Sequence, residues 1–219
     1  DHLIGEAVKF DITAYYKDIN DLVTTRSSFE VAGNSVTFFV NEDYGSAKGV
    51  DISVEKLPAN DFITGSLSYG YMVAKGIGSD ALEPYYTYLT SLEDTLAPLT
   101  EYPLDFDQRH TLTAVIDFRV PYDRHLKVAG LAIPGGWGIN TVGHYGSGLP
   151  YTMTDVDGNR LGDRNSGRLP AYYTVDMRFN KDFRMSRGGS ILSFFVEIDN
   201  LFNRRNIINV YSLTGCADD

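Results

Sequence analysis

Seven stretches of this sequence alternate apolar and polar residues, which is the period of a β-strand with two unlike sides. In the clearest stretch, Tyr172 to Asp182, the odd-numbered positions are mostly apolar and the even-numbered positions are mostly polar. The segments between the stretches are roughly alternately short and long. Strands of this kind, joined with this rhythm, are typical of the wall of an antiparallel transmembrane β-barrel.

The expected strands are Val8 to Lys17 with an extension to Arg26, Ser35 to Leu57, Phe62 to Lys75, Arg109 to Val120, Trp137 to Tyr145, Tyr172 to Asp182 and Ile191 to Phe202. Pro58 to Asp61 has the residues of a tight turn. Two long loops are expected at Gly76 to Asp105 and at Tyr151 to Pro170. A medium connection follows Pro121 and contains the chain breakers Gly130, Pro134, Gly135 and Gly136.

Composition alone does not separate a membrane barrel from a soluble β-sandwich. The chain is 43% hydrophobic, and its mean hydropathy of -0.19 would suit a soluble domain. A barrel strand needs only one apolar side, however, so a barrel lacks the run of roughly 20 apolar residues that marks a membrane helix. Sandwich strands average about 5 or 6 residues, whereas tilted membrane strands need about 9 to 11. Strand length, together with 15 Tyr and 12 Phe that suit interfacial girdles, therefore favours the barrel.

The net charge of -10 argues against a nucleic-acid partner, because phosphates attract clustered Lys and Arg. The single cysteine, Cys216, has no internal disulfide partner, and its role stays open.

The sequence contains weak matches to catalytic and metal motifs, and each has a simpler interpretation. Gly76 to Ala81 reads G-x-G-x-x-A, but Pro84 interrupts the helix that a dinucleotide site requires. Asp155 to Ser166 resembles a calcium loop, yet its last position lacks the bidentate Glu, so a turn is favoured. Ser147 does not have the spacing of a nucleophile elbow. The histidines are isolated: His2, His110, His125 and His144. No catalytic residue, metal or cofactor is expected.

Several segments resemble, in amino-acid sequence and in their order along the chain, the C-terminal barrel of TonB-dependent outer-membrane receptors. They are Asn41 to Glu55 (NEDYGSAKGVDISVE), Asp107 to Ala114 (DQRHTLTA), Tyr145 to Thr152 (YGSGLPYT), Arg168 to Arg178 (RLPAYYTVDMR) and Val196 to Asn203 (VEIDNLFN). The resemblance covers about residues 7 to 211. It implies an all-β, 22-strand barrel, of which residues 1–219 would supply a C-terminal portion of about seven strands. The N-terminal plug domain and the closing strand would lie outside this chain.

The resemblance further implies a receptor in the outer membrane that takes up a scarce nutrient with energy from TonB and is not an enzyme. Its expected partners are outer-membrane lipid, its own plug domain, TonB acting through that plug, and a small nutrient ligand of unknown class. Two alternatives stay open, a passive outer-membrane porin or enzyme and a soluble β-sandwich that binds a ligand.

Two sets of residues are the candidate functional sites. The wall residues expected to face the lumen are Asp117, Arg119, Asp176, Arg178, Glu197 and Asp199. The long loop supplies tyrosines whose rings and hydroxyls suit the capture of a polar solute, namely Tyr85, Tyr86, Tyr88 and Tyr102. The apolar side, including Val175, Met177 and Phe179, is expected to meet lipid.

Overall fold

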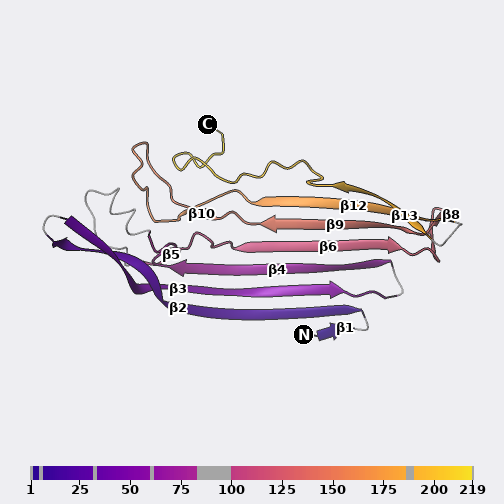
Figure 1. Ribbon diagram of the computed structural model, residues 1–219, viewed down its shortest axis with the longest axis horizontal. Coiled ribbons are helices and arrows are strands. Elements are labelled where there is room, and N and C mark those ends of the chain that lie inside the picture. The colour runs from indigo at the N-terminus through magenta and orange to yellow at the C-terminus, as the bar shows by residue number, and fades with distance from the viewer. Residues whose placement is uncertain are drawn as a thin grey trace.

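A computed structural model describes residues 2–4, 7–31, 34–59, 62–82, 100–185 and 190–218. Its main feature is a nine-stranded antiparallel sheet with the order β1-β2-β3-β4-β6-β9-β12-β13, in which β5 also pairs with β4. Figure 1 shows the long strands side by side in chain order. The strands of this sheet are β1 (His2–Ile4), β2 (Val8–Val31), β3 (Asn34–Lys56), β4 (Ile63–Gly76), β5 (Tyr102–Pro103), β6 (His110–Val120), β9 (Trp137–Gly146), β12 (Tyr172–Arg184) and β13 (Ile191–Ile198).

The all-β, antiparallel fold expected from the alternation is confirmed, and the seven expected strands correspond to β2, β3, β4, β6, β9, β12 and β13. The sheet is open, as a partial barrel must be, because β1 and β13 do not pair with each other. Two strand ends differ from expectation by more than two residues. β2 continues to Val31, and β13 ends at Ile198 because the chain bends at Asp199 and Asn200 takes a φ of 51°.

The sheet has an apolar side and a polar side, and the strand register defines both. Residues directly opposite each other in antiparallel strands lie on the same side. One row of the apolar side consists of Gly65, Ile116, Thr141, Met177 and Ile198, and the next consists of Ile63, Phe118, Ile139, Phe179 and Val196. Among the residues that the structure describes, no second layer covers these side chains, since Ile116 is 54% exposed and Val196 is 59% exposed. The fold is therefore not a sandwich.

Aromatic residues mark both limits of the apolar side. At the end where the chain forms long loops, the loop end, the Tyr69 hydroxyl and His110 Nδ1 are 2.8 Å apart, and the Tyr71 and His110 ring centroids are 5.3 Å apart. At the other end, the turn end, four rings form a turn-end aromatic row. Successive centroids in this row, Phe62 to Phe118, Phe118 to Trp137 and Trp137 to Phe179, lie 6.1, 5.5 and 6.4 Å apart.

The separation of these aromatic limits matches a membrane. β6 runs from His110 at the loop-end limit to Val120, which pairs with Trp137 of the turn-end row. Ten steps of about 3.3 Å cover about 33 Å along the strand, which at a tilt of about 40° gives a height of about 25 Å. This is the height of the apolar band of an outer-membrane barrel.

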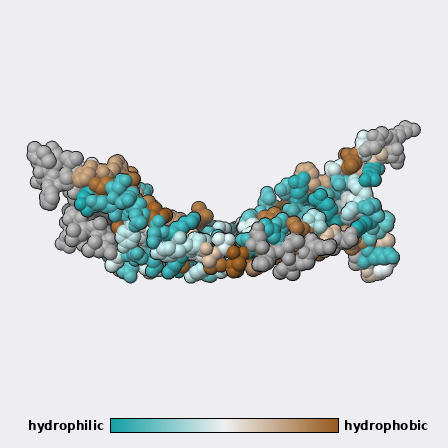
Figure 2. Space-filling model, turned by 90° about the horizontal axis from the view of Figure 1, so that it is seen from below, coloured by the Kyte–Doolittle hydropathy of each residue, from teal (hydrophilic) through white to brown (hydrophobic). Residues whose placement is uncertain are grey.

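The hairpin of β2 and β3 is much longer than a membrane crossing requires. β2 has 24 residues, or about 79 Å of extended chain. The register shifts of the pair all lie beyond Ile19, on the loop side of the apolar band. Figure 1 shows this hairpin extending past the other strands, and Figure 2 shows the curved profile of the molecule.

Two small hairpins lie in the connections. β10 (Pro150–Tyr151) pairs with β11 (Gly167–Arg168) in the second long loop. β7 (His125–Val128) pairs with β8 (Leu131–Pro134) within the connection after Pro121, where the sequence predicted only chain breakers. Ala129 and Gly130 have φ values of 48° and 83°, the positive values that a type I′ hairpin turn requires. Among the described residues, no helix is long and apolar enough to cross a membrane.

Candidate functional site

Two rows on the polar side, near the loop end, are made mainly of small hydroxyl residues and glycines. We call them the hydroxyl rows. The first consists of Thr13, Asp51, Gly70, Thr111, Gly146 and Tyr172, and the second of Asp11, Ser53, Ser68, Thr113, His144 and Thr174. Each row crosses six neighbouring strands, β2 to β12, in continuous register, so polar groups extend across most of the width of the wall.

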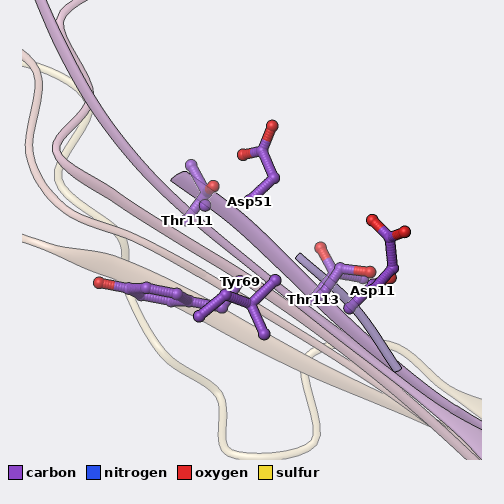
Figure 3. Close-up of a pocket in the computed structure, with 9 residues that line it drawn as sticks. Asp11, Asp51, Tyr69, Thr111 and Thr113 are labelled. Carbon is purple, nitrogen blue, oxygen red and sulfur yellow. The ribbon is translucent and has the colours of Figure 1, made fainter. Parts of the chain in front are cut away.

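A hollow of about 240 Å³ lies in the hydroxyl rows, between Asp51 and Thr113. Gly70 keeps it open, because a Cβ at this position would lie 2.7 Å from Thr111 Oγ1 and 3.1 Å from Asp51 Oδ1. Figure 3 shows Asp11 and Asp51 extending from one side of the strands, whereas the ring of Tyr69 lies on the other. The hollow offers carboxylate and hydroxyl oxygens, which suit a hydrated or hydroxyl-bearing solute.

A charged row crosses the polar side closer to the turn end. It consists of Asp117, Asn140, Arg178 and Glu197, which lie opposite one another on four neighbouring strands. Arg119 Nε is 3.5 Å from Asp117 Oδ2, and the Arg178 guanidinium lies 4.4 Å from the centre of the Phe195 ring. Asp117, Arg119 and Arg178 also line a hollow of about 370 Å³.

The structure thus brings four of the six expected lumen residues together and places the other two nearby. Asp176 Oδ1 accepts a hydrogen bond of 2.7 Å from the Asn200 backbone N–H, at the bend that ends β13. Asp199 is exposed at the same bend. Contact of any of the six with a plug or a solute stays a prediction.

A buried carboxylate holds the two long loops against the end of the sheet. Asp107 has no exposed surface, and its Oδ1 accepts from the Ala74 backbone N–H at 2.7 Å. Its Oδ2 accepts from Arg109 Nε at 2.8 Å and from Arg168 Nη2, which belongs to the second loop. We call Asp107, Arg109 and Arg168 the loop anchor. Burial lowers the pKa of Arg109, but the hydrogen bond and charge of Asp107, with a contribution from Tyr71, outweigh it and raise the pKa above its ordinary value.

Asn165 makes a second connection between the loops. Its Nδ2 donates to Pro103 O and to Asp105 Oδ1, both at 2.7 Å, and its backbone N–H donates to Thr152 Oγ1 at 3.1 Å. The backbone of Asn165 has a φ of 55°, a conformation that asparagine tolerates better than most residues. Sequence reasoning missed both connections, because each joins residues about sixty positions apart.

A cavity of about 500 Å³ lies between the loops, and basic residues outnumber acidic residues in its lining. The charged residues around it are Lys75, Arg109, Arg160, Arg164 and Arg168, with Glu101 and Asp163. Tyr102, an expected ligand residue, also lines this cavity. It is 4% exposed, its hydroxyl donates to Ile77 O at 3.2 Å, and the Arg164 guanidinium lies 5.1 Å from its ring centre. Tyr85, Tyr86 and Tyr88 lie outside the described residues.

The segment that resembles a calcium loop forms a turn closed by its own side chains. Asp155 Oδ1 accepts from the backbone N–H groups of Asp157 and Asn159 at 3.0 and 2.8 Å. The Asn159 side chain and backbone lower the pKa of the Asp155 carboxyl below its ordinary value of 3.8. In the described part of the chain, no three His, Cys, Asp or Glu residues come together as metal ligands would.

Comparison with known proteins gives one family and one solved structure. Residues 4–201 match the family described as TonB dependent receptor-like, beta-barrel. The fold is similar to that of the outer membrane transporter YddB from Escherichia coli, with a TM-score of 0.62 and 15% sequence identity. The similarity covers 94% of this chain but 28% of that transporter, so this chain spans little more than a quarter of its length. No curated protein sequence matches the chain.

Proposed function

This chain belongs to the TonB-dependent receptor family as part of an outer-membrane β-barrel, and we propose that its parent protein takes up a scarce nutrient with energy from TonB. The family and fold are those of transporters and receptors, not of enzymes. In this proposal the chain supplies wall and outer loops, and it performs no chemistry on the solute.

The observation that carries the proposal is that one wall has an apolar side, a polar side and an end that carries two long loops, which suit three different environments. The apolar side, limited by aromatic residues at both ends, suits lipid. The polar side suits a lumen, and the loop anchor secures the two long loops at one end of the wall. A wall with this division needs water or protein on its polar side, since charged side chains are costly in lipid.

Within the lumen, we assign different roles to the two parts of the polar side. The charged row with Arg119, Asp176 and Asp199 would meet the plug domain of the parent protein, because fixed opposite charges favour a fixed partner. The hydroxyl rows would line the path of the solute, since many weak hydrogen-bonding groups allow a solute both to bind and to leave. The loop tyrosines Tyr85, Tyr86, Tyr88 and Tyr102 would capture the solute at the barrel mouth.

Growth tests in the source cell examine the uptake function. Deleting the parent gene should abolish growth when one nutrient, chosen from a panel of iron chelates, cobalamin and glycans, is limiting. The same growth defect should appear when TonB is inactivated and the receptor is intact. Uptake that continues without TonB would contradict the proposal and would support the passive porin.

A loop deletion examines ligand capture. Removing residues 86–96 from the full-length receptor leaves Tyr102 and Asp107 in place, so the Tyr102 hydroxyl can still donate to Ile77 O and the loop anchor keeps its hydrogen bonds. We expect weaker binding of the identified nutrient with normal heat-modifiable migration of the barrel. Deleting residues 156–159 of the second loop, which leaves Arg160 of the cavity lining in place, is the matched control. Unchanged affinity after the first deletion would mean that the loop only covers the mouth.

A further inference from the structure

The β7–β8 hairpin at the turn end is amphipathic, although it is not part of the wall. By register, Leu126 and Ile133 lie opposite each other, and Leu131 falls on the same side, two residues before Ile133. His125 and Lys127 lie on the other side, opposite Pro134 and Ala132. Leu131 is 74% exposed and Ile133 is 38% exposed. An apolar side therefore faces away from protein.

This exposure does not come from the open edges of the sheet. The hairpin joins β6 to β9, and both strands have a neighbour on each side. An isolated two-stranded hairpin is at best marginally stable in water and needs a partner for its apolar side. The hairpin hydrogen-bonds only with itself, and the exposure of Leu131 shows that no other described strand covers this apolar side.

The base of the hairpin lies at the limit of the membrane, against the lipid-facing side of the wall. The Arg124 guanidinium is 5.9 Å from the ring centre of Phe62, which belongs to the turn-end aromatic row. Lys181 lies on the apolar side of β12, and its Nζ donates to Gly135 O at 2.7 Å. Figure 1 likewise shows β8 at the turn end of the long strands.

We propose that the β7–β8 hairpin binds the phospholipid leaflet at the turn end, with Leu126, Leu131 and Ile133 among the acyl chains and Arg124 and Lys127 at the phosphates. Amphipathic elements at a membrane surface bury their apolar side about 5 to 10 Å into the boundary between head groups and chains. Basic residues beside that boundary are attracted to anionic lipid. Asp123 is the only acidic residue between Pro121 and Gly136, so this segment carries a net positive charge in an acidic chain.

Photo-crosslinking in the full-length receptor tests this proposal. The receptor, with p-benzoylphenylalanine at one position, is reconstituted in vesicles of phosphatidylethanolamine and phosphatidylglycerol and irradiated, and lipid adducts are detected by mass spectrometry. The three positions compared are 131, 116 and 156. Ile116 is 54% exposed on the lipid-facing wall, and Val156 is 81% exposed in the second long loop, so they serve as positive and negative controls.

We expect phospholipid adducts at positions 131 and 116 and none at position 156. With Lys127→Gln in the mixed vesicles, we expect a lower share of phosphatidylglycerol among the lipid adducts at position 131 and no change in that share at 116. Absence of lipid adducts at 131 while 116 reacts would overturn the proposal. An adduct at 131 with another protein, or with a second copy of the receptor, in irradiated cells would also overturn it.

Discussion

A cation placed on the apolar side of the wall should show how deep each row lies in the membrane. Ile116 is 54% exposed on that side, and it is one residue from the midpoint of β6 between His110 and Val120. One residue corresponds to about 2.5 Å of depth for a strand tilted by about 40°. Ile116→Arg therefore places a guanidinium close to the bilayer centre, where such a charge costs about 2 to 4 kcal/mol.

This cost corresponds to a loss of roughly 30- to 700-fold in the folding equilibrium, since every 1.4 kcal/mol is tenfold. Ile198→Arg, in the same row, should have a similar effect. Thr113→Arg changes the same strand on its polar side, beside Ser68 and His144, and should cost far less. Urea titration of the full-length receptor folded into phospholipid vesicles, followed by heat-modifiable migration, measures all three variants. Equal stabilities would refute the assignment of the two sides.

Three further results are expected. Asp107→Ala leaves two partly buried arginines without their carboxylate and should destabilise the loop end by about 3 kcal/mol, whereas Asp107→Asn should cost less, as measured by proteolysis of the two loops. Ala129→Asn should stabilise the β7–β8 hairpin by about 1 kcal/mol, because asparagine tolerates positive φ and Asn-Gly suits a type I′ turn; slower amide hydrogen exchange in β7 would report it. Because the pKa of Asp155 is lowered, its carboxylate stabilises the 155–159 turn above pH 3.8, and this stabilisation is lost as the pH falls through the lowered pKa. Hydrogen exchange of the Asn159 backbone amide should show this loss. The variant Asp155→Asn should remove the pH dependence.

The strands of the wall could be predicted from the sequence because the alternation that identifies each strand lies within that strand. β12 was expected at Tyr172 to Asp182 and extends from Tyr172 to Arg184, since alternation with period two follows directly from strand geometry. The end of β13 was wrong by four residues. The apolar residues Leu201 and Phe202 continue the pattern, but Asn200 turns the chain and accepts a hydrogen bond from the Arg204 backbone N–H.

The loop anchor and the β7–β8 hairpin could not be predicted in the same way. Asp107 and Arg168 are 61 residues apart, and nothing in their local sequence indicates that they meet. The hairpin has strands of only four residues, too short for alternation to stand out from the flanking glycines and prolines. Its turn has Ala129 where Asn or Asp would give a clear signal.

The uninterrupted register of the wall has a mechanical consequence. From β3 to β12, every described strand pair keeps its register over the full apolar band, and the only shifts lie in the β2–β3 hairpin beyond that band. Sliding one strand by a single residue would turn its lipid-facing side chains inward and its charges into the bilayer. The wall therefore behaves as a stiff plate that resists shear between its strands. In the proposed uptake, a passage must therefore open through movement of the plug domain inside the barrel or of the loops over its mouth, and not through movement within the wall.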